Sequence, residues 1–169
     1  MSLTHDAELW QERLAALPLE SYGPDETVLT EGTSTGRLLI LKSGVVSIVK
    51  GGTEIAQIAR PGAVFGELSA LLGQPHTADV LTLEASEFYV ADATALLVQD
   101  PVALLYVAMS LAQRVDGANH LLLELKSELQ AGESPGLMSK TVERIEGMLS
   151  AIGSGYIRAG AGYSIYPFA

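Results

Sequence analysis

Gly66 and Glu67 stand together in a segment whose residue types suggest a binding site for a small ligand. If a short helix begins at Gly66, its first backbone N–H groups have no partner within the helix and can receive an anion. Glycine also lets a ligand approach the backbone closely. Glu67 would repel a bare phosphate there, but it can accept a hydrogen bond from a neutral hydroxyl such as a ribose 2′-OH. The pair therefore fits a sugar phosphate better than phosphate alone.

Short β-rich runs surround this segment and must position it. Turn signals such as Ser43-Gly44 and Gly51-Gly52 separate them, and strands at this regular spacing predict an antiparallel sandwich or roll. A parallel sheet is disfavoured because the chain lacks a long crossover helix between the runs. The strands are expected at residues 27–30, 38–42, 45–50, 54–59, 78–83 and 88–91.

Helical patterns flank the strands. Apolar residues Trp10, Leu14 and Leu17 predict an amphipathic helix over residues 4–17, and Pro18 ends it. A long helix is expected from Pro101, and a second over residues 139–152. The chain thus divides into residues 1–130, a β-roll with its closing helix, and 131–169, a C-terminal helix and tail. The closing helix carries a heptad seam: Leu104, Ala108, Leu111, Val115, Ala118, Leu122, Leu125 and Leu129.

The order of these signals resembles a known family. Residues 61–72, PGAVFGELSALL, followed by 75–80, PHTADV, are similar to the phosphate-binding cassette of cyclic-nucleotide-binding domains, as in the catabolite activator protein and the regulatory subunits of protein kinase A. Flanking glycines, hairpins and closing helix follow in the same order over residues 10–130. The resemblance implies a mainly β fold with flanking helices: an antiparallel β-roll (double-stranded jelly roll) with an N-terminal helix and a long C-terminal helix.

The resemblance also implies roles for single residues. Gly66, Leu68 and Ser69 would present backbone N–H groups to the ligand, and Ser69 also has a hydroxyl to offer. Glu67 would accept a hydrogen bond from the ribose 2′-OH, and Thr77 would lie beside the phosphate. The implied function is a cyclic-nucleotide sensor, with cAMP or cGMP as the ligand and no metal ion.

His76 departs from the pattern of the family. An arginine that pairs with the cyclic phosphate stands at this position in the family's functional cassette. Arginine is always charged and can fork onto two oxygens, whereas imidazole is only partly charged near pH 7. The loss of such a bond costs about 1.5 to 3 kcal/mol, which is about ten- to a hundredfold in affinity. If His76 acts in its place, Glu67 and a ligand phosphate should raise its pKa, and binding should weaken as the pH rises past that value.

The closing helix raises two further questions. Asn119 is the candidate for a contact with the base, because its amide can hydrogen-bond a purine edge; the alternative is a solvated residue at the rim of the seam. The seam itself predicts a homodimer through residues 104–129, since strict heptad spacing makes a narrow stripe. A helix that lies on its own β-roll is the competing interpretation.

Composition excludes several classes of function. The 169 residues carry 10 Lys and Arg against 20 Asp and Glu, a formal net charge of −10, so DNA and membrane surfaces are not expected partners. Residues after the seam hold few cations and one predicted helix, which does not make a winged helix-turn-helix. With no cysteine and three scattered histidines, neither a metal site nor an enzyme is expected, and the expected compartment is the cytoplasm.

Two hypotheses remain from the sequence. In the first, a cyclic mononucleotide binds the cassette and repositions the closing helix. In the second, the cassette keeps its turn geometry without a nucleotide, and the chain is a dimerising or partner-binding scaffold that uses the seam and the helix at residues 139–152 to recruit another protein. His76 favours the second hypothesis, whereas the cassette sequence favours the first.

Overall fold

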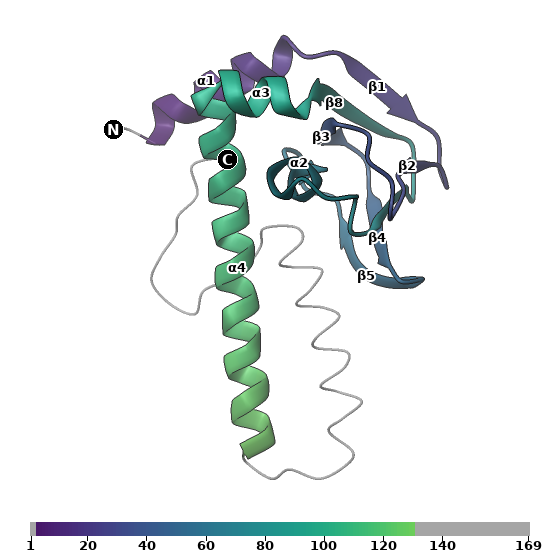
Figure 1. Cartoon of the computed structure of the whole chain (residues 1–169), viewed down its shortest axis with the longest axis vertical. Helices are drawn as coiled ribbons and strands as arrows, with labels where there is room; N and C mark the ends of the chain where they lie inside the picture. The colour runs from purple at the N-terminus through teal and green to yellow at the C-terminus, as the bar shows by residue number, and fades with distance from the viewer. Residues whose placement is uncertain (1–2, 131–169) are drawn as a thin grey trace.

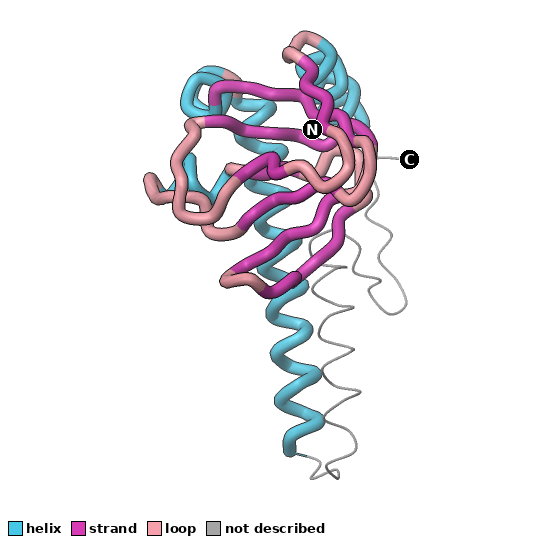
Figure 2. The backbone as a smooth tube through the Cα atoms, turned by 90° about the vertical axis from the view of Figure 1, so that its right-hand side faces the viewer, coloured by secondary structure: helices cyan, strands magenta, loops and turns pink. Residues whose placement is uncertain are grey.

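Two antiparallel four-stranded sheets form the body of the protein (Figures 1 and 2). The structure, a computed structural model, describes residues 3–130. The strand orders are β1-β8-β3-β6 and β2-β7-β4-β5, and every pairing in this part of the chain is antiparallel, which confirms the predicted roll. The strands are β1 (Leu19–Tyr22), β2 (Thr27–Leu29), β3 (Arg37–Ser43), β4 (Val46–Lys50), β5 (Thr53–Ile58), β6 (Val64–Phe65), β7 (Asp79–Thr82) and β8 (Ser86–Asp92).

Strand β3 is buried on both faces, and this explains its uninterrupted apolar run. Side chains alternate between the two faces of a strand. Leu39 and Leu41 belong to the cluster between the two sheets. Leu38 and Ile40 point the other way, into a second cluster that the helices complete. All four are fully buried, so β3 fixes the helices to the roll.

Within residues 3–130, four helices accompany the sheets: α1 (Leu3–Ala15), α2 (Glu67–Leu72), α3 (Ala93–Gln99) and α4 (Pro101–Gln130). The helix α3 directly precedes the long helix that the sequence predicts from Pro101. Asp92 caps it by accepting a hydrogen bond from the Ala95 backbone N–H at 2.7 Å. Asp100 caps α4 in the same manner and also pairs with Arg13 of α1 at 3.1 Å. The junction of α3 and α4 is thereby tied to the N-terminal helix.

Trp10 of α1 and Tyr106 of α4 stack with ring centroids 4.3 Å apart. Trp10 is 1% exposed, and the Tyr106 hydroxyl donates a hydrogen bond to the Gly62 carbonyl at 3.1 Å. The predicted amphipathic N-terminal helix is confirmed, with a slightly earlier end at Ala15. Its core side chains pack on α4 rather than on the strands alone.

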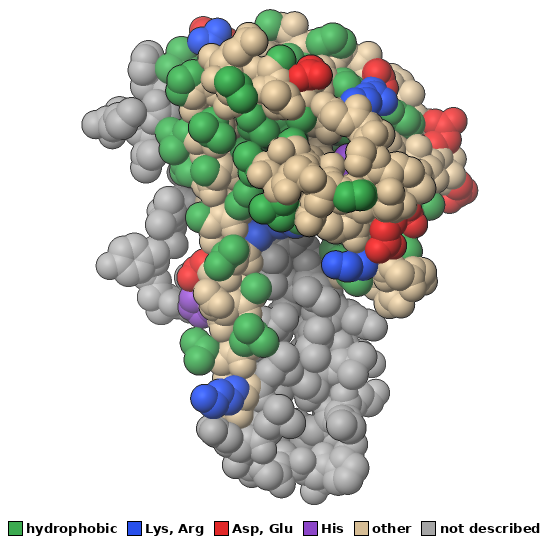
Figure 3. Space-filling model, viewed as in Figure 1, with side chains coloured by type: hydrophobic (Ala, Val, Ile, Leu, Met, Phe, Trp, Pro, Cys, Tyr) green, Lys and Arg blue, Asp and Glu red, His purple; other side chains and the backbone are tan. Residues whose placement is uncertain are grey.

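The helix α4 contacts the rest of the molecule mainly through a face other than the heptad seam, to which the seam residue Leu111 adds a half-buried contact. Ala103 and Val107 are fully buried, whereas Val115 and Leu122 of the seam are 61% and 63% exposed. Figures 1 and 2 show α4 extending well beyond the sheets, and Figure 3 shows hydrophobic side chains along this extension. Of the seam residues whose side chains the structure describes, Leu111 packs on the core and the others are exposed, so most of this part of the seam does not hold α4 to its own β-roll.

No single helix within residues 3–130 has both the length and the apolarity to cross a membrane; α3 and Pro101–Glu124 meet both conditions only as a pair bent by 105°. The helix expected over residues 139–152 lies outside the described residues.

Candidate functional site

The cassette is built around two glycines that bound helix α2. Gly66 and Gly73 have left-handed backbones, with φ of 89° and 63°, and the helix begins where the sequence predicts. A Cβ atom on Gly66 would lie 2.4 Å from the carbonyl oxygen of Arg37, far inside van der Waals contact. From the sequence, the glycine is expected to allow the close approach of a ligand. The structure adds the approach of β3 to the cassette, which by itself requires glycine.

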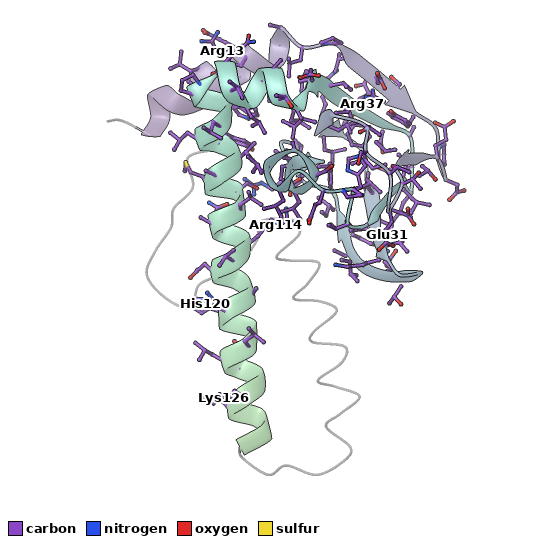
Figure 4. All side chains as sticks on the ribbon, viewed as in Figure 1. Arg13, Glu31, Arg37, Arg114, His120 and Lys126 are labelled. Atoms are coloured by element: carbon purple, nitrogen blue, oxygen red, sulfur yellow. The ribbon has the colours of Figure 1, made fainter. Side chains whose placement is uncertain are left out.

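Glu67, the first residue of α2, is a buried acid: only 4% of it is exposed. Its Oε1 accepts a hydrogen bond from Nη1 of Arg114 at 2.5 Å. Figure 4 shows Arg114 on α4, which passes beside α2. Buried carboxylates need a partner, and the partner of Glu67 is a residue that lies 47 positions later in the chain.

Arg114 was missed by the sequence argument. The available signal was a lone cation in the otherwise apolar first half of a helix expected to close over the cassette. That signal does not identify which acid the guanidinium meets, because the pairing depends on how α4 returns across α2. The ion pair joins the cassette directly to the helix that the proposed mechanism moves.

His76 is 5% exposed and held by three hydrogen bonds. Its Nε2 lies 2.9 Å from the Thr35 hydroxyl oxygen. Its backbone N–H donates to the Thr33 carbonyl at 2.7 Å, and its carbonyl accepts from the Gly32 N–H at 2.8 Å. The side chain therefore lies inside the loop between β2 and β3 and is fixed in place.

Burial lowers the pKa of His76 below its usual value of 6.5, and the nearby Glu67 carboxylate offsets only part of this effect. In the ligand-free protein, the pKa of His76 is therefore lowered and not raised; the raised value is expected with a ligand phosphate beside it. Near pH 7 the imidazole is neutral. A phosphate that reached it would meet a hydrogen-bond donor without a full positive charge.

The other predicted site residues differ in how they are placed. The Ser69 hydroxyl donates to the Gln74 carbonyl at 2.6 Å, so it is used to close α2. Leu68 and Thr77 are half-buried within the cassette. Asn119 is exposed and follows the buried Gly117 by two residues, which is about 200° around the helix. The structure brings the cassette residues together, but it leaves Asn119 on the far side of α4.

Within residues 3–130, no group of three or more His, Asp or Glu side chains has the arrangement of a metal site. The arginine at the start of β3 is also engaged: Arg37 pairs with Glu20 of β1. Arg114 is joined to the cassette by its ion pair with Glu67.

Three comparisons agree with this architecture. The model of the cyclic nucleotide-binding domain family matches residues 19–98. A cGMP-dependent protein kinase of Toxoplasma gondii is 39% identical over 75 residues, which is 44% of this chain and 7% of the kinase. The match is confined to a small part of that protein, so the kinase activity does not transfer with it.

Solved structures share the fold. The catabolite activator protein of Thermus thermophilus is 25% identical with a TM-score of 0.58; the match covers 75% of this chain and 63% of that one. The domain called CBD2 of a protein kinase A regulatory subunit, solved with bound Sp-2Cl-cAMPS, is 22% identical with a TM-score of 0.56. The match covers 73% of this chain and 86% of that one. Residues 19–98 of the chain thus match the family of cyclic nucleotide-binding domains, and the roll around them has the fold of these solved structures.

Proposed function

We propose that this chain is a regulatory module that binds a cyclic mononucleotide at the cassette between Gly66 and Thr77 and transmits the binding through α4. The observation that carries the proposal is the burial of Glu67 and its hydrogen bond to Arg114. This carboxylate stands at the position where the family accepts the ribose 2′-OH, and it is hydrogen-bonded to α4 through Arg114. A ligand that engages Glu67 acts on the contact between cassette and helix.

The ligand is held by donors from the cassette and by His76. Backbone N–H groups of Gly66 and Leu68 serve the sugar phosphate, and Thr77 stands beside the phosphate. When the Thr35 hydroxyl donates to Nε2 of His76, the neutral imidazole carries its proton on Nδ1 and can donate to a phosphate oxygen. An adjacent phosphate also raises the pKa of the imidazole, so binding takes up a proton.

The proposed ligand is either cAMP or cGMP. One relative is described as cGMP-dependent, and one solved neighbour holds a cAMP analogue. A role for Asn119 in reading the base requires α4 to turn, or a second copy of the chain to present its own α4. We retain the homodimer through residues 104–129 as part of this proposal, because Leu104, Val115 and Leu122 of the seam are exposed apolar side chains.

A scaffold without a nucleotide is the second candidate. It is favoured by a specific observation: Glu67 and His76 both have internal partners, Arg114 and Thr35. In this reading the exposed seam and the predicted helix at residues 139–152 bind another protein, and the cassette serves only to shape the roll.

Isothermal titration with cAMP and cGMP at about pH 6 and about pH 8 tests the proposal on the wild type and His76→Arg. Because the variant restores a fixed charge, we expect it to bind about ten- to a hundredfold more tightly. The wild type should bind more weakly at the higher pH, and the variant should lose this dependence. His120→Arg places the same substitution on an exposed part of α4 and serves as the control. Failure of both wild type and His76→Arg to bind favours the scaffold.

A further inference from the structure

We propose that Arg114 supplies the positive charge that the cassette lacks, so that the phosphate of the ligand is recognised from helix α4. The inference rests on the proposed function and adds a residue to it. In the ligand-free protein the guanidinium is held on Glu67. In the complex it also contacts the phosphate, and the ligand bridges cassette and helix.

The geometry leaves Arg114 with unused donors. A single N–H bond, from Nη1, joins it to Oε1 of Glu67 at 2.5 Å. A guanidinium has five N–H donors in a fixed plane, and its planar fork suits phosphate oxygens. The Glu67 side chain is 6% exposed, whereas the Arg114 side chain is 37% exposed. One edge of the guanidinium is therefore anchored on the buried acid while part of it remains open to solvent.

Charge balance favours the same arrangement. Glu67 and Arg114 neutralise each other, and His76, buried against Thr35, adds no full charge near pH 7. An entering cyclic phosphate brings one negative charge into this neutral group. Arg37, at the start of β3, is paired with Glu20. Arg114 is already paired with the buried acid of the cassette, so the anion is drawn to it.

The ribose allows Arg114 to shift part of its hydrogen bonding from Glu67 to the phosphate. A buried carboxylate that loses its partner is strongly destabilised, and Arg114 therefore does not leave Glu67 without a replacement. A 2′-OH that donates to Glu67 provides that replacement and frees part of the guanidinium for the phosphate. A cyclic nucleotide carries both groups, and the inference predicts that neither alone repositions Arg114.

Two double-substitution series separate this role from a merely structural one. The first compares Arg114→Gln in the wild type and in His76→Arg, with cAMP and cGMP as probes in calorimetry. If Arg114 provides the phosphate charge, its loss weakens binding about tenfold or more in the wild type and much less where an arginine at position 76 supplies the charge. The control Lys126→Gln removes a cation from an exposed position on α4 and should change nothing.

The second series guards against misfolding, because Arg114→Gln leaves Glu67 buried and unpaired. Glu67→Gln removes that charge, and Arg114→Gln is then added to it; circular dichroism checks both proteins. If the guanidinium binds the phosphate, its removal from the Glu67→Gln protein still lowers the affinity for the nucleotide about tenfold. A guanidinium that only positions Glu67 costs nothing more there.

The outcomes are distinct. Equal penalties for Arg114→Gln with and without the arginine at position 76, or no added penalty in Glu67→Gln, overturn the role of Arg114 and leave cyclic-nucleotide binding intact. Absence of nucleotide binding by the wild type overturns this inference. If His76→Arg also fails to bind either nucleotide, the proposed function fails as well. A penalty that shrinks in His76→Arg and persists in Glu67→Gln supports the inference.

Discussion

At the scale of residues, the cassette contains a buried imidazole that burial keeps neutral. The pKa of His76 lies below its usual value of 6.5 because desolvation outweighs the attraction of Glu67. Below that usual value the unfolded chain takes up a proton before the folded protein does. This titration destabilises the fold as the pH falls, and it disfavours the charged form of His76 that would bind a phosphate most strongly.

Thermal unfolding should show this titration. The contribution of His76 is fully present above the unfolded pKa of about 6.5, and it declines as the pH falls from there toward the lowered folded pKa. We expect the melting temperature of the wild type to fall more steeply between about pH 7.5 and pH 5.5 than that of His76→Gln. His120→Gln, at an exposed position, should follow the wild type. Parallel curves for wild type and His76→Gln would contradict the direction of the shift.

Gly66 allows a second test at this scale. Alanine there combines a left-handed backbone with a Cβ atom 2.4 Å from the Arg37 carbonyl oxygen. We expect Gly66→Ala to lower the free energy of unfolding by about 3 kcal/mol or more. Gly73→Ala has the same backbone strain, but nothing lies within 4 Å of its Cβ, so about 1 to 2 kcal/mol is expected. Denaturant titration measures both, and equal losses would show that β3 yields to the added methyl group.

At the scale of elements, α4 has separate surfaces for separate tasks. Ala103, Val107 and Arg114 face the roll and the cassette, whereas Val115 and Leu122 of the heptad seam are exposed to solvent. A helix that used its seam to cover its own domain would bury Val115 and Leu122. The exposed seam is the structural reason to expect a second copy of the chain there.

A charge placed in the seam tests that expectation. Val115→Glu puts a carboxylate at a seam position that is 61% exposed, where it has little effect on the isolated domain. If the seam forms the dimer, the variant should sediment as a monomer at concentrations where the wild type is dimeric. Val98→Glu makes the same change on α3, at a residue 78% exposed, and should not alter the mass. A monomeric wild type would refute the dimer outright.

At the scale of the whole molecule, Trp10 is placed to report on α4. It is the protein's only tryptophan, and it stacks on Tyr106, whose hydroxyl also donates a hydrogen bond to the Gly62 carbonyl at the start of the cassette. The Arg13–Asp100 pair fixes the same junction. Movement of α4 relative to the roll must therefore change the surroundings of the indole.

Ligand binding should accordingly alter the Trp10 fluorescence. We expect saturating cAMP or cGMP to shift or quench its emission, with the same midpoint as the calorimetric titration. Lys126→Gln should give the wild-type change, while Arg114→Gln should reduce it, because the link between Glu67 and α4 is then lost. Calorimetric binding with unchanged emission would show that the nucleotide binds without moving α4.

The sequence by itself determined the antiparallel roll, the glycine-bounded helix α2, and the long helix from Pro101. These features follow from local rules: alternation and turn residues set strands, glycine permits positive φ, and apolar period sets a helix. The strands β1 and β6 escaped the sequence argument. Leu19–Tyr22 gains its place through pairing with β8, and Val64–Phe65 has only two residues to signal a strand.

Only the tertiary structure decided which side chains meet. Glu67 and His76 were recognisable as cassette residues, but the return of α4 across α2 selected Arg114 as the partner of the acid, and the loop between β2 and β3 placed Thr35 on the imidazole. The direction of the His76 pKa likewise depends on burial, which no local pattern reports. Charges respond to neighbours that are distant in sequence, whereas strands and helices respond mainly to neighbours along the chain.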